Sequence, residues 1–208
     1  MKNLNLIVCG RIGTNSYLLS DEEKNAVVID VPDGSGEKLA DFCVENGLKP
    51  LAILLTHGHF DHCGGVAGFL RKINVPVYAS EADAELMNKA SQNRFRVPAE
   101  NCAATEFVCD GETLKIGNFE FKVMATPGHT DGSVCYFIDD FMFSGDTLFC
   151  DSIGRTDFAE SNPQKMKESL AKINKIERNY IVFPGHEEST RLKDEQENNI
   201  YLRGECSF

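Results

Sequence analysis

Three histidines and an aspartate fall within six positions of this chain, in the segment His57-Gly58-His59-Phe60-Asp61-His62. The segment directly follows the apolar run 51–55, which predicts a buried strand that ends where these residues begin. His57 and His59 are two positions apart, so in an extended segment their side chains point the same way. Asp61 and His62 follow at a turn and can face a second centre. Neutral imidazoles gain nothing from clustering, so we expect a metal site at the carboxyl end of a strand, and in its sharper form a two-metal site.

The remaining two histidines and one further aspartate stand in the same local pattern. Each follows an apolar run and a turn that contains glycine, namely 119–125 before His129, 141–143 before Asp146 and 180–183 before His186. Glycine permits a tight turn and a close approach of the backbone. We therefore expect four strands to hold these side chains at one edge of a sheet structure, as a preorganised site requires.

Counting the donors favours two metal ions. The pattern collects all five histidines and two aspartates: His57, His59, Asp61, His62, His129, Asp146 and His186. One catalytic zinc uses three protein ligands, so seven suit two ions with one bridging carboxylate. No cysteine stands in these loops at zinc-finger spacing, so a closed structural zinc site is not expected.

Length and charge bound the remaining possibilities. A chain of 208 residues with 42% hydrophobic residues predicts a single domain, 1–208, with a substantial core. The net charge of −11 argues against nucleic acid as a partner, because phosphate backbones are bound by surfaces rich in Lys and Arg. No apolar run approaches the roughly 20 residues that a membrane helix needs, so no membrane partner is expected.

The cysteines and the first residues bear on the compartment. Residues 1–19 have neither the long apolar core nor the small-residue cleavage site of a signal peptide. The eight cysteines are irregularly spaced, and four of them stand in or beside apolar runs: Cys9, Cys43, Cys109 and Cys135. We expect buried free thiols in a reducing cytosol, and hence a cytoplasmic protein.

Apolar periodicity divides the rest of the chain into strands and helices. Strands are expected at 4–9, 16–20 and 26–29 and again from about 108 to 143, and the spacing of apolar residues predicts helices near 39–47 and 66–73. Ser80 with Asp83 resembles a capping box that opens a helix, and Asn162-Pro163 predicts the start of another. Residues 91–105 predict a loop near the site, and 189–203 a polar closing helix.

These motifs resemble the metallo-β-lactamase superfamily, whose His-x-His-x-Asp-His loop is followed by a His, an Asp and a last His. The segments Gly145–Phe149 and Gly154–Phe158 are similar to the short, single-domain hydrolases of its glyoxalase II branch. The resemblance implies an α+β fold, an αββα four-layer sandwich with the metals at one edge. It also implies metal one at His57, His59 and His129, metal two at Asp61, His62 and His186, and Asp146 as the bridge.

The resemblance implies a metal-dependent hydrolase of small thioesters, such as S-lactoylglutathione, that uses a metal-bridging hydroxide. Asp146 would hold the two ions together, and Asp61 would orient the nucleophile. A thioester fits because its leaving thiol has a pKa of about 8.5 and departs as the thiolate without protonation, whereas an amide nitrogen needs an acid and no histidine is left for that task. The longer glyoxalase II enzymes carry a C-terminal helical region that supplies much of their glutathione site. The expected partner is therefore a small thioester, and glutathione is only one candidate for its thiol component.

Several alternatives stay open. A persulfide dioxygenase, a relative with the same Gly-Arg-Thr-Asp-Phe segment, would bind one iron through His57, His129 and Asp146. Lactonase chemistry and a non-catalytic metal-binding relative rank lower. Zinc is the expected metal, with iron and manganese as alternatives. Three further residues are candidates for substrate contact or for support of the site: Arg155, Asp157 and Tyr17. For Arg155 and Asp157 a simple ion pair is the favoured interpretation.

Overall fold

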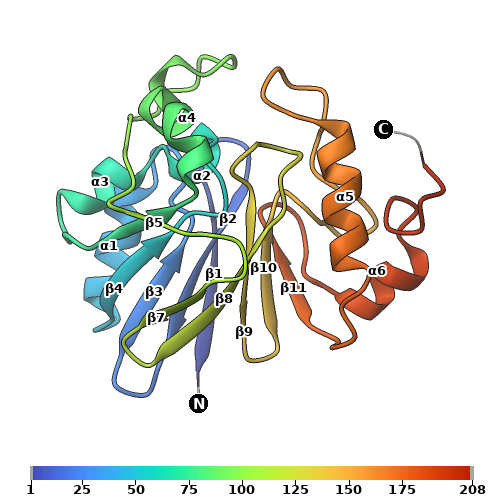
Figure 1. Ribbon diagram of the computed structural model, residues 1–208. Helices are drawn as coiled ribbons and strands as arrows, with labels where there is room; N and C mark the ends of the chain where they lie inside the picture. The colour runs from blue at the N-terminus through green and yellow to red at the C-terminus, as the bar shows by residue number, and fades with distance from the viewer. Residues whose placement is uncertain (1, 207–208) are drawn as a thin grey trace.

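The chain forms two mixed six-stranded sheets that pack face to face, with helices on both outer faces (Figure 1). The computed structural model describes residues 2–206. In order, the first sheet contains β1 (Asn3–Cys9), β2 (Thr14–Ser20), β3 (Asn25–Ile29), β4 (Lys49–Leu54), β5 (Val77–Ala79) and β6 (Glu106–Phe107). In order, the second contains β12 (Thr190–Arg191), β11 (Ile181–Pro184), β10 (Phe141–Gly145), β9 (Val134–Ile138), β8 (Phe119–Ala125) and β7 (Thr113–Ile116).

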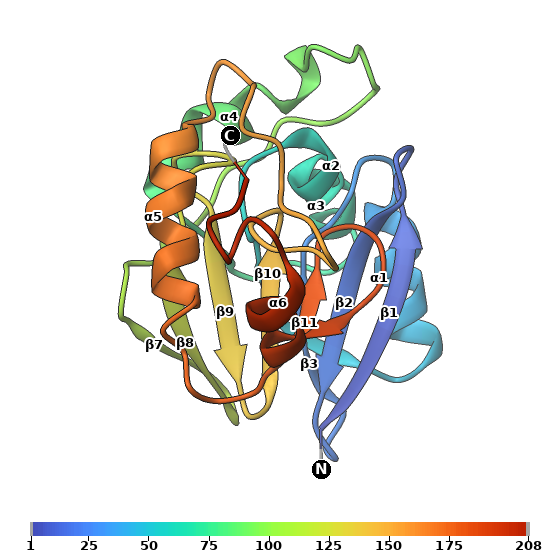
Figure 2. The ribbon, with the colours of Figure 1, turned by 90° about the vertical axis from the view of Figure 1, so that its right-hand side faces the viewer.

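Short helices lie on the outer faces of the two sheets and at one edge of the sandwich (Figure 1). They are α1 (Gly36–Glu45), α2 (Phe60–Cys63), α3 (Val66–Leu70), α4 (Ala84–Asn88), α5 (Pro163–Ile173) and α6 (Leu192–Asn198), with 3-10 turns η1 (Glu81–Asp83) and η2 (Ala90–Gln92). In Figure 1, α1 and α3 lie on the left of the sheets and α5 and α6 on the right. Figure 2 shows the same layers from the side of α6. The expected αββα sandwich is confirmed.

Three apolar clusters separate the four layers. The middle one joins the sheets and includes Leu54, Phe121 and Phe143, all fully buried. The outer ones seat α1 and α3 on the first sheet and α5 and α6 on the second. In β8 the pattern alternates, with Phe121 buried and its neighbours Glu120 and Lys122 exposed, because successive strand residues point to opposite faces. Each large buried side chain contributes about 1.5–3 kcal/mol.

The strand directions bring several carboxyl ends to one edge of the sandwich. β3 and β4 are parallel, as are β10 and β11. β8 and β10 are both antiparallel to β9, so they run in the same direction as each other. Every segment predicted to carry a metal ligand therefore leaves its strand at this edge.

Most of the expected elements are present, with shifts at their ends. The strands near 4–9, 16–20 and 26–29 and the helix that begins at Pro163, capped by the Asn162 side chain, are confirmed. The closing helix is shorter than expected at both ends: residues 190 and 191 instead form β12 beside β11, and the helix ends at Asn198. Cys109 is exposed rather than buried, since it lies in the turn before β7, and all eight cysteines are free thiols. Within residues 2–206, no helix combines the length and apolar character needed to cross a bilayer.

Candidate metal centre

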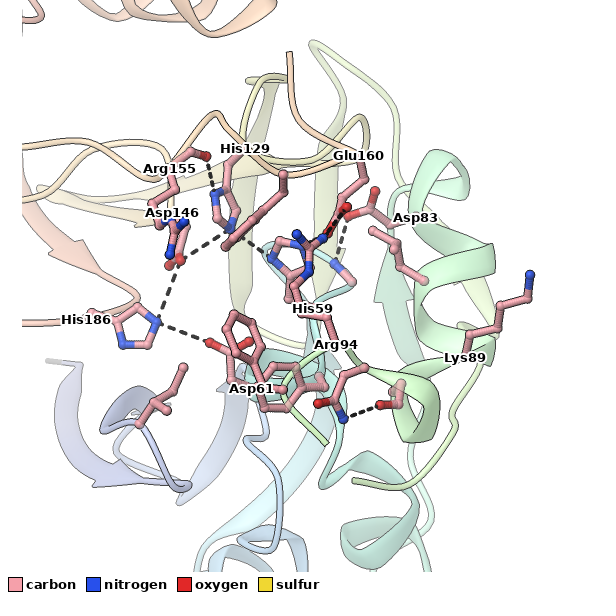
Figure 3. Close-up of a pocket in the computed structure, with 18 of the residues that line it drawn as sticks. His59, Asp61, Asp83, Lys89, Arg94, His129, Asp146, Arg155, Glu160 and His186 are labelled. Carbon is pink, nitrogen blue, oxygen red and sulfur yellow. Dashed lines mark hydrogen bonds and ion pairs between the residues drawn. The ribbon is translucent and has the colours of Figure 1, made fainter. Parts of the chain in front are cut away.

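The seven predicted ligands meet at the edge where the strands end, and Figure 3 shows five of them, labelled, around one cavity. Their donor atoms form three overlapping groups in which all atoms lie within 4.8 Å of one another. The groups are His57 with His59 and His129, Asp61 with His62 and His186, and His57 with His62 and Asp146. The first two are the two sets that the family resemblance implies. Which ion each set binds stays a prediction.

Glycines let the ligand loops approach this closely. A Cβ at Gly185 would lie 2.2 Å from Asp146 Oδ1 and 2.5 Å from His62 Cε1, so any side chain there would overlap two predicted ligands. Gly145 has a φ of +50°, and a Cβ there would lie 2.5 Å from Thr56 Oγ1. Both turns therefore need glycine for close packing, and the turn that carries Asp146 needs it for the backbone conformation as well.

The outer contacts of His59 and His129 determine which ring nitrogen faces the centre. His129 Nδ1 lies 2.8 Å from the carbonyl oxygen of Arg155, which only accepts, so Nδ1 carries the proton and Nε2 is bare. His59 Nε2 lies 2.9 Å from a Glu160 carboxylate oxygen, so the proton is on Nε2 and Nδ1 is bare. The two bare nitrogens face each other at 2.8 Å. Two lone pairs at that distance repel, so the arrangement suits a cation bound between them.

Asp30, directly after β3, orients the other two histidines of the opening motif. Its carboxylate accepts hydrogen bonds from His62 Nδ1 and from the Thr56 hydroxyl, each at 2.7 Å. Thr56 Oγ1, having donated its proton to Asp30, accepts from His57 Nδ1 at 3.2 Å. Within residues 2–206, the inward Nε2 atoms of His57 and His62 are buried and have no hydrogen-bond partner. Buried polar atoms without partners are rare in stable folds, so a metal ion would satisfy them.

The carboxylates lie between the two histidine groups. The Asp146 oxygens are 3.3 Å from His62 Nε2, 3.4 Å from His129 Nε2 and 3.6 Å from His186 Nε2. Asp61 Oδ2 is 3.2 Å from His186 Nε2. Burial alone would raise the pKa of Asp146, but the surrounding histidines, His62 foremost, hold it well below its usual range. Burial lowers the pKa of His129 to about 4. Carboxylate and imidazole groups gathered in this way are the donor set that zinc, iron and manganese accept.

Asp83 is a structural member of the site that the sequence did not reveal. Only 1% of it is exposed, and it accepts three hydrogen bonds. The donors are the Gly58 amide at 2.7 Å, the Thr130 hydroxyl at 2.7 Å and the Gly132 amide at 2.8 Å. Asp83 therefore ties the His57–His59 loop to the loop after His129. The expected capping box is wrong in this part: Ser80 caps η1, but the Asp83 carboxylate is directed to these loops instead.

A cavity of about 1080 Å³ opens over the candidate ligands. Its apolar lining includes four aromatic rings and two isoleucines: Phe60, Phe95, Phe149, Phe158, Ile12 and Ile153. Part of the loop 91–105 lines it, as expected. Arg155 also lines it, and its guanidinium pairs with Asp157 through two contacts of 2.9 and 2.7 Å. Both side chains are exposed, so the favoured interpretation as an ion pair agrees with the structure.

Tyr17 lies outside this cavity and supports the loop that carries His186. Its ring packs against Phe143 and Phe183, and its hydroxyl donates to the Pro184 carbonyl at 2.6 Å. The Asn15 side chain donates to the same carbonyl at 3.0 Å and to Glu187 O at 2.9 Å. The structure thus gives Tyr17 a supporting position and no contact with the cavity surface.

Known proteins resemble the chain over most of its length. It is 37% identical over 204 residues to a probable metallo-hydrolase, YqgX, of Bacillus subtilis, covering 94% of this chain and 95% of that protein. It is 32% identical to hydroxyacylglutathione hydrolase GloC of Haemophilus influenzae, covering 96% and 98%. A hydroxyacylglutathione hydrolase of Pectobacterium carotovorum is 35% identical over 172 residues, and there the match covers 82% of this chain but only 61% of the relative.

Three solved structures are similar in fold and sequence. The B3 metallo-β-lactamase BLEG-1 has a TM-score of 0.88 and 36% identity, covering 96% of this chain and 99% of that one. TTHA1623 in a di-iron-bound form has a TM-score of 0.84 and 33% identity, covering 94% and 98%. ETHE1 from Myxococcus xanthus has a TM-score of 0.81 and 27% identity, covering 97% and 85%. The model of the metallo-beta-lactamase superfamily matches residues 9–186, and the chain belongs to that superfamily.

Proposed function

We propose that this chain is a binuclear metallohydrolase of small thioesters. The observation that carries the proposal is the convergence of seven nitrogen and oxygen donors, from residues of which five line one open cavity. Four of the histidines have an outer partner that turns the opposite ring nitrogen inward. A donor set oriented in this way costs little further ordering when ions bind.

Two divalent ions bound here would supply a hydroxide near neutral pH and a Lewis acid for the acyl oxygen. Asp146 has contacts to His62, His129 and His186, so its carboxylate is suited to join the two halves of the site. Asp61 lies on the side of His186 and would accept a hydrogen bond from the attacking water and orient it. Asp30 and Thr56 keep the rings of His62 and His57 fixed while substrate enters.

The thioester class fits the proton-donating groups near the site. All five histidines belong to the candidate metal groups, so none is left as a general acid for a poor leaving group. A thiolate departs unprotonated near neutral pH, whereas an amide nitrogen does not. Two relatives named hydroxyacylglutathione hydrolase support this class, one of them over nearly its full length. The aromatic and aliphatic cavity wall suits the apolar part of a small acylated thiol.

Two specific observations favour other activities on the same site. The similarity to TTHA1623 in a di-iron-bound form keeps iron as a candidate metal, and with it the persulfide dioxygenase activity that is expected for a single bound iron. A one-iron set would use His57, His129 and Asp146 and would leave the second group, Asp61, His62 and His186, without an ion, which favours two ions. The 36% identity to BLEG-1 makes β-lactam hydrolysis a second candidate.

One substrate panel tests these activities together. Native protein would first be analysed for metals, and then forms loaded with zinc, iron and manganese would be assayed. The panel holds thioesters of glutathione and coenzyme A, a chromogenic cephalosporin, and glutathione persulfide with oxygen uptake. We expect thiol release from a thioester. Because Asp146→Asn changes a ligand itself, we expect it to lose more activity than the factor of about 10–100 that is typical for changes of outer partners. Failure of every metal form to cleave any thioester would refute the proposal, whichever other substrate turned over.

A further inference from the structure

Glu160 is placed to control one of the candidate ligands from outside. Its Oε1 lies 2.9 Å from His59 Nε2, on the side of the ring opposite the bare Nδ1 (Figure 3). Only 12% of the His59 side chain and 21% of the Glu160 side chain are exposed, so water competes weakly for this contact. A carboxylate can only accept here, so the contact fixes the His59 proton on Nε2.

Arg94 and Phe158 hold Glu160 in this position. The Arg94 guanidinium pairs with both oxygens of the Glu160 carboxylate, and its carbon lies 4.1 Å from the centre of the Phe158 ring. Phe158 in turn packs edge-to-face on His59, with the ring centres 5.7 Å apart. Arg94 comes from the loop after η2 and Glu160 from the loop before α5, so this contact joins the two sides of the cavity mouth.

His59 depends on this contact more than the neighbouring ligands depend on theirs. His129 is oriented by a backbone carbonyl, and His57 by a buried hydroxyl close to it in the chain. Backbone and buried partners cannot turn away, whereas Glu160 is a side chain 101 positions from His59. Among the outer partners that the described residues give the first candidate group, Glu160 alone carries a charge. An ionised partner raises the basicity of the ring nitrogen that binds metal.

We propose that Glu160, held by Arg94, is a positioning residue that fixes His59 for metal binding and sets the affinity of the first metal position. The inference rests on the metal binding that the proposed function requires. Outer partners of this kind typically contribute about 10–100-fold to metal affinity. Within residues 2–206, the hydrogen bonds of the Glu160 side chain go to His59 and Arg94, so the second position, formed by Asp61, His62 and His186, should keep its affinity.

The test is a titration of metal-free protein with zinc in competition with a chromogenic chelator. For Glu160→Ala we expect one of two equivalents to bind about 10–100-fold more weakly, with the other unchanged. Glu160→Gln keeps an accepting oxygen but loses the charge, so its loss should be smaller. Arg94→Leu leaves Glu160 in place without its anchor and should also lose less than Glu160→Ala.

Glu100→Ala is the matched control. Glu100 has a similar pairing with an arginine, Arg71, but this pair is exposed and neither residue lines the cavity. It should bind both equivalents as the wild type does. Unfolding of the metal-free variants by urea would show whether each is folded before titration.

A readout without metal separates positioning from general damage. Long-range proton–nitrogen NMR spectra of the metal-free protein should show His59 protonated at Nε2 in the wild type, and a shift toward the Nδ1 form in Glu160→Ala. The proposal is overturned if wild-type His59 carries its proton on Nδ1, or if folded Glu160→Ala binds both equivalents within about twofold of the wild type. If the wild type itself binds no metal, both this inference and the proposed function fail, whereas the two results above remove this inference alone.

Discussion

The contact between the two ligand loops at Asp83 makes the sharpest prediction for stability. Asp83→Asn keeps the shape of the side chain but turns one accepting oxygen into an amide nitrogen. With that nitrogen toward the Gly132 amide, two donors face each other at the former 2.8 Å contact, while Gly58 and Thr130 keep their acceptor. The opposite orientation loses the Gly58 contact, while the Thr130 hydroxyl can accept from the new amide nitrogen. Either orientation therefore loses one hydrogen bond from a backbone amide.

The magnitude follows from this count. A lost hydrogen bond to a charged group costs about 1.5–3 kcal/mol, and the donors left without an acceptor stay buried, so water does not replace the lost bond. Burial raises the pKa of Asp83, so removing its charge returns part of this cost. We expect Asp83→Asn to lower the free energy of unfolding by about 2 kcal/mol. In Asp83→Ala all three donors lose their partner, and the cost rises to about 4 kcal/mol.

Urea unfolding of the metal-free protein in chelator measures both values, and zinc titration of the folded variants adds a second readout. His57, His59 and His129 lie on the loops that Asp83 joins, so the first metal position should weaken while the second is less affected. Ser80→Ala serves as the control, because it removes only the local cap of η1 and should cost about 1 kcal/mol without changing metal affinity. A change below about 0.5 kcal/mol in Asp83→Asn would refute the idea that this carboxylate holds the loops together.

Three further predictions concern the loops around the site. Gly128 has a φ of +150°, and a Cβ there would lie 2.4 Å from Met166 Cα. Gly128→Ala should therefore displace α5 and lower the free energy of unfolding by more than about 3 kcal/mol, whereas near-normal thermal unfolding of this variant would count against the packing. Tyr17→Phe should cost only about 1 kcal/mol in urea, because Pro184 O still accepts from Asn15, and a loss above about 2 kcal/mol would contradict this. Burial lowers the pKa of His129 to about 4, below the ordinary value near 6.5. As pH falls from about 6.5 to 4, the unfolded chain binds a proton at this residue before the folded chain does, so the metal-free protein loses stability. His129→Gln should remove this part of the loss. Urea titrations at about pH 7 and 5 that gave equal losses for both proteins would disprove this prediction.

The candidate ligands could be found from the sequence because each is announced by its own neighbours. An apolar run that is followed within a few residues by a histidine or aspartate is a local signal, and parallel strands bring such residues to one edge. Asp30 carries the same signal after the run 26–29, yet a lone aspartate after a strand has no chemical partner in the sequence to mark it. Its function depends on His62, which is 32 positions away.

Asp83 and Glu160 had no comparable signal. Asp83 fits a capping box by spacing, and the competing partners Gly58 and Thr130 lie 25 and 47 positions away. Glu160 stands in an irregular loop, and its partner His59 is 101 positions away. Such contacts depend on how two loops pack, and no periodicity of either segment encodes that packing. The start of the closing helix was predicted too early for a related reason. Residues 190 and 191 could also have been helical, but they pair with β11 instead.

The contacts that the sequence hides are those that fix the directions of the His59, His62 and His129 imidazoles. A histidine can present either ring nitrogen, so placing five of them at one edge does not by itself make a metal site. Asp30, Glu160 and the Arg155 carbonyl take the outer nitrogens, and the inner ones are then left bare or unpaired. The site therefore depends on two levels of specification, with the donor types set by local sequence and their orientation set by long-range packing. A variant can keep all seven ligands and still lose metal affinity, which is the outcome that Glu160→Ala is designed to detect.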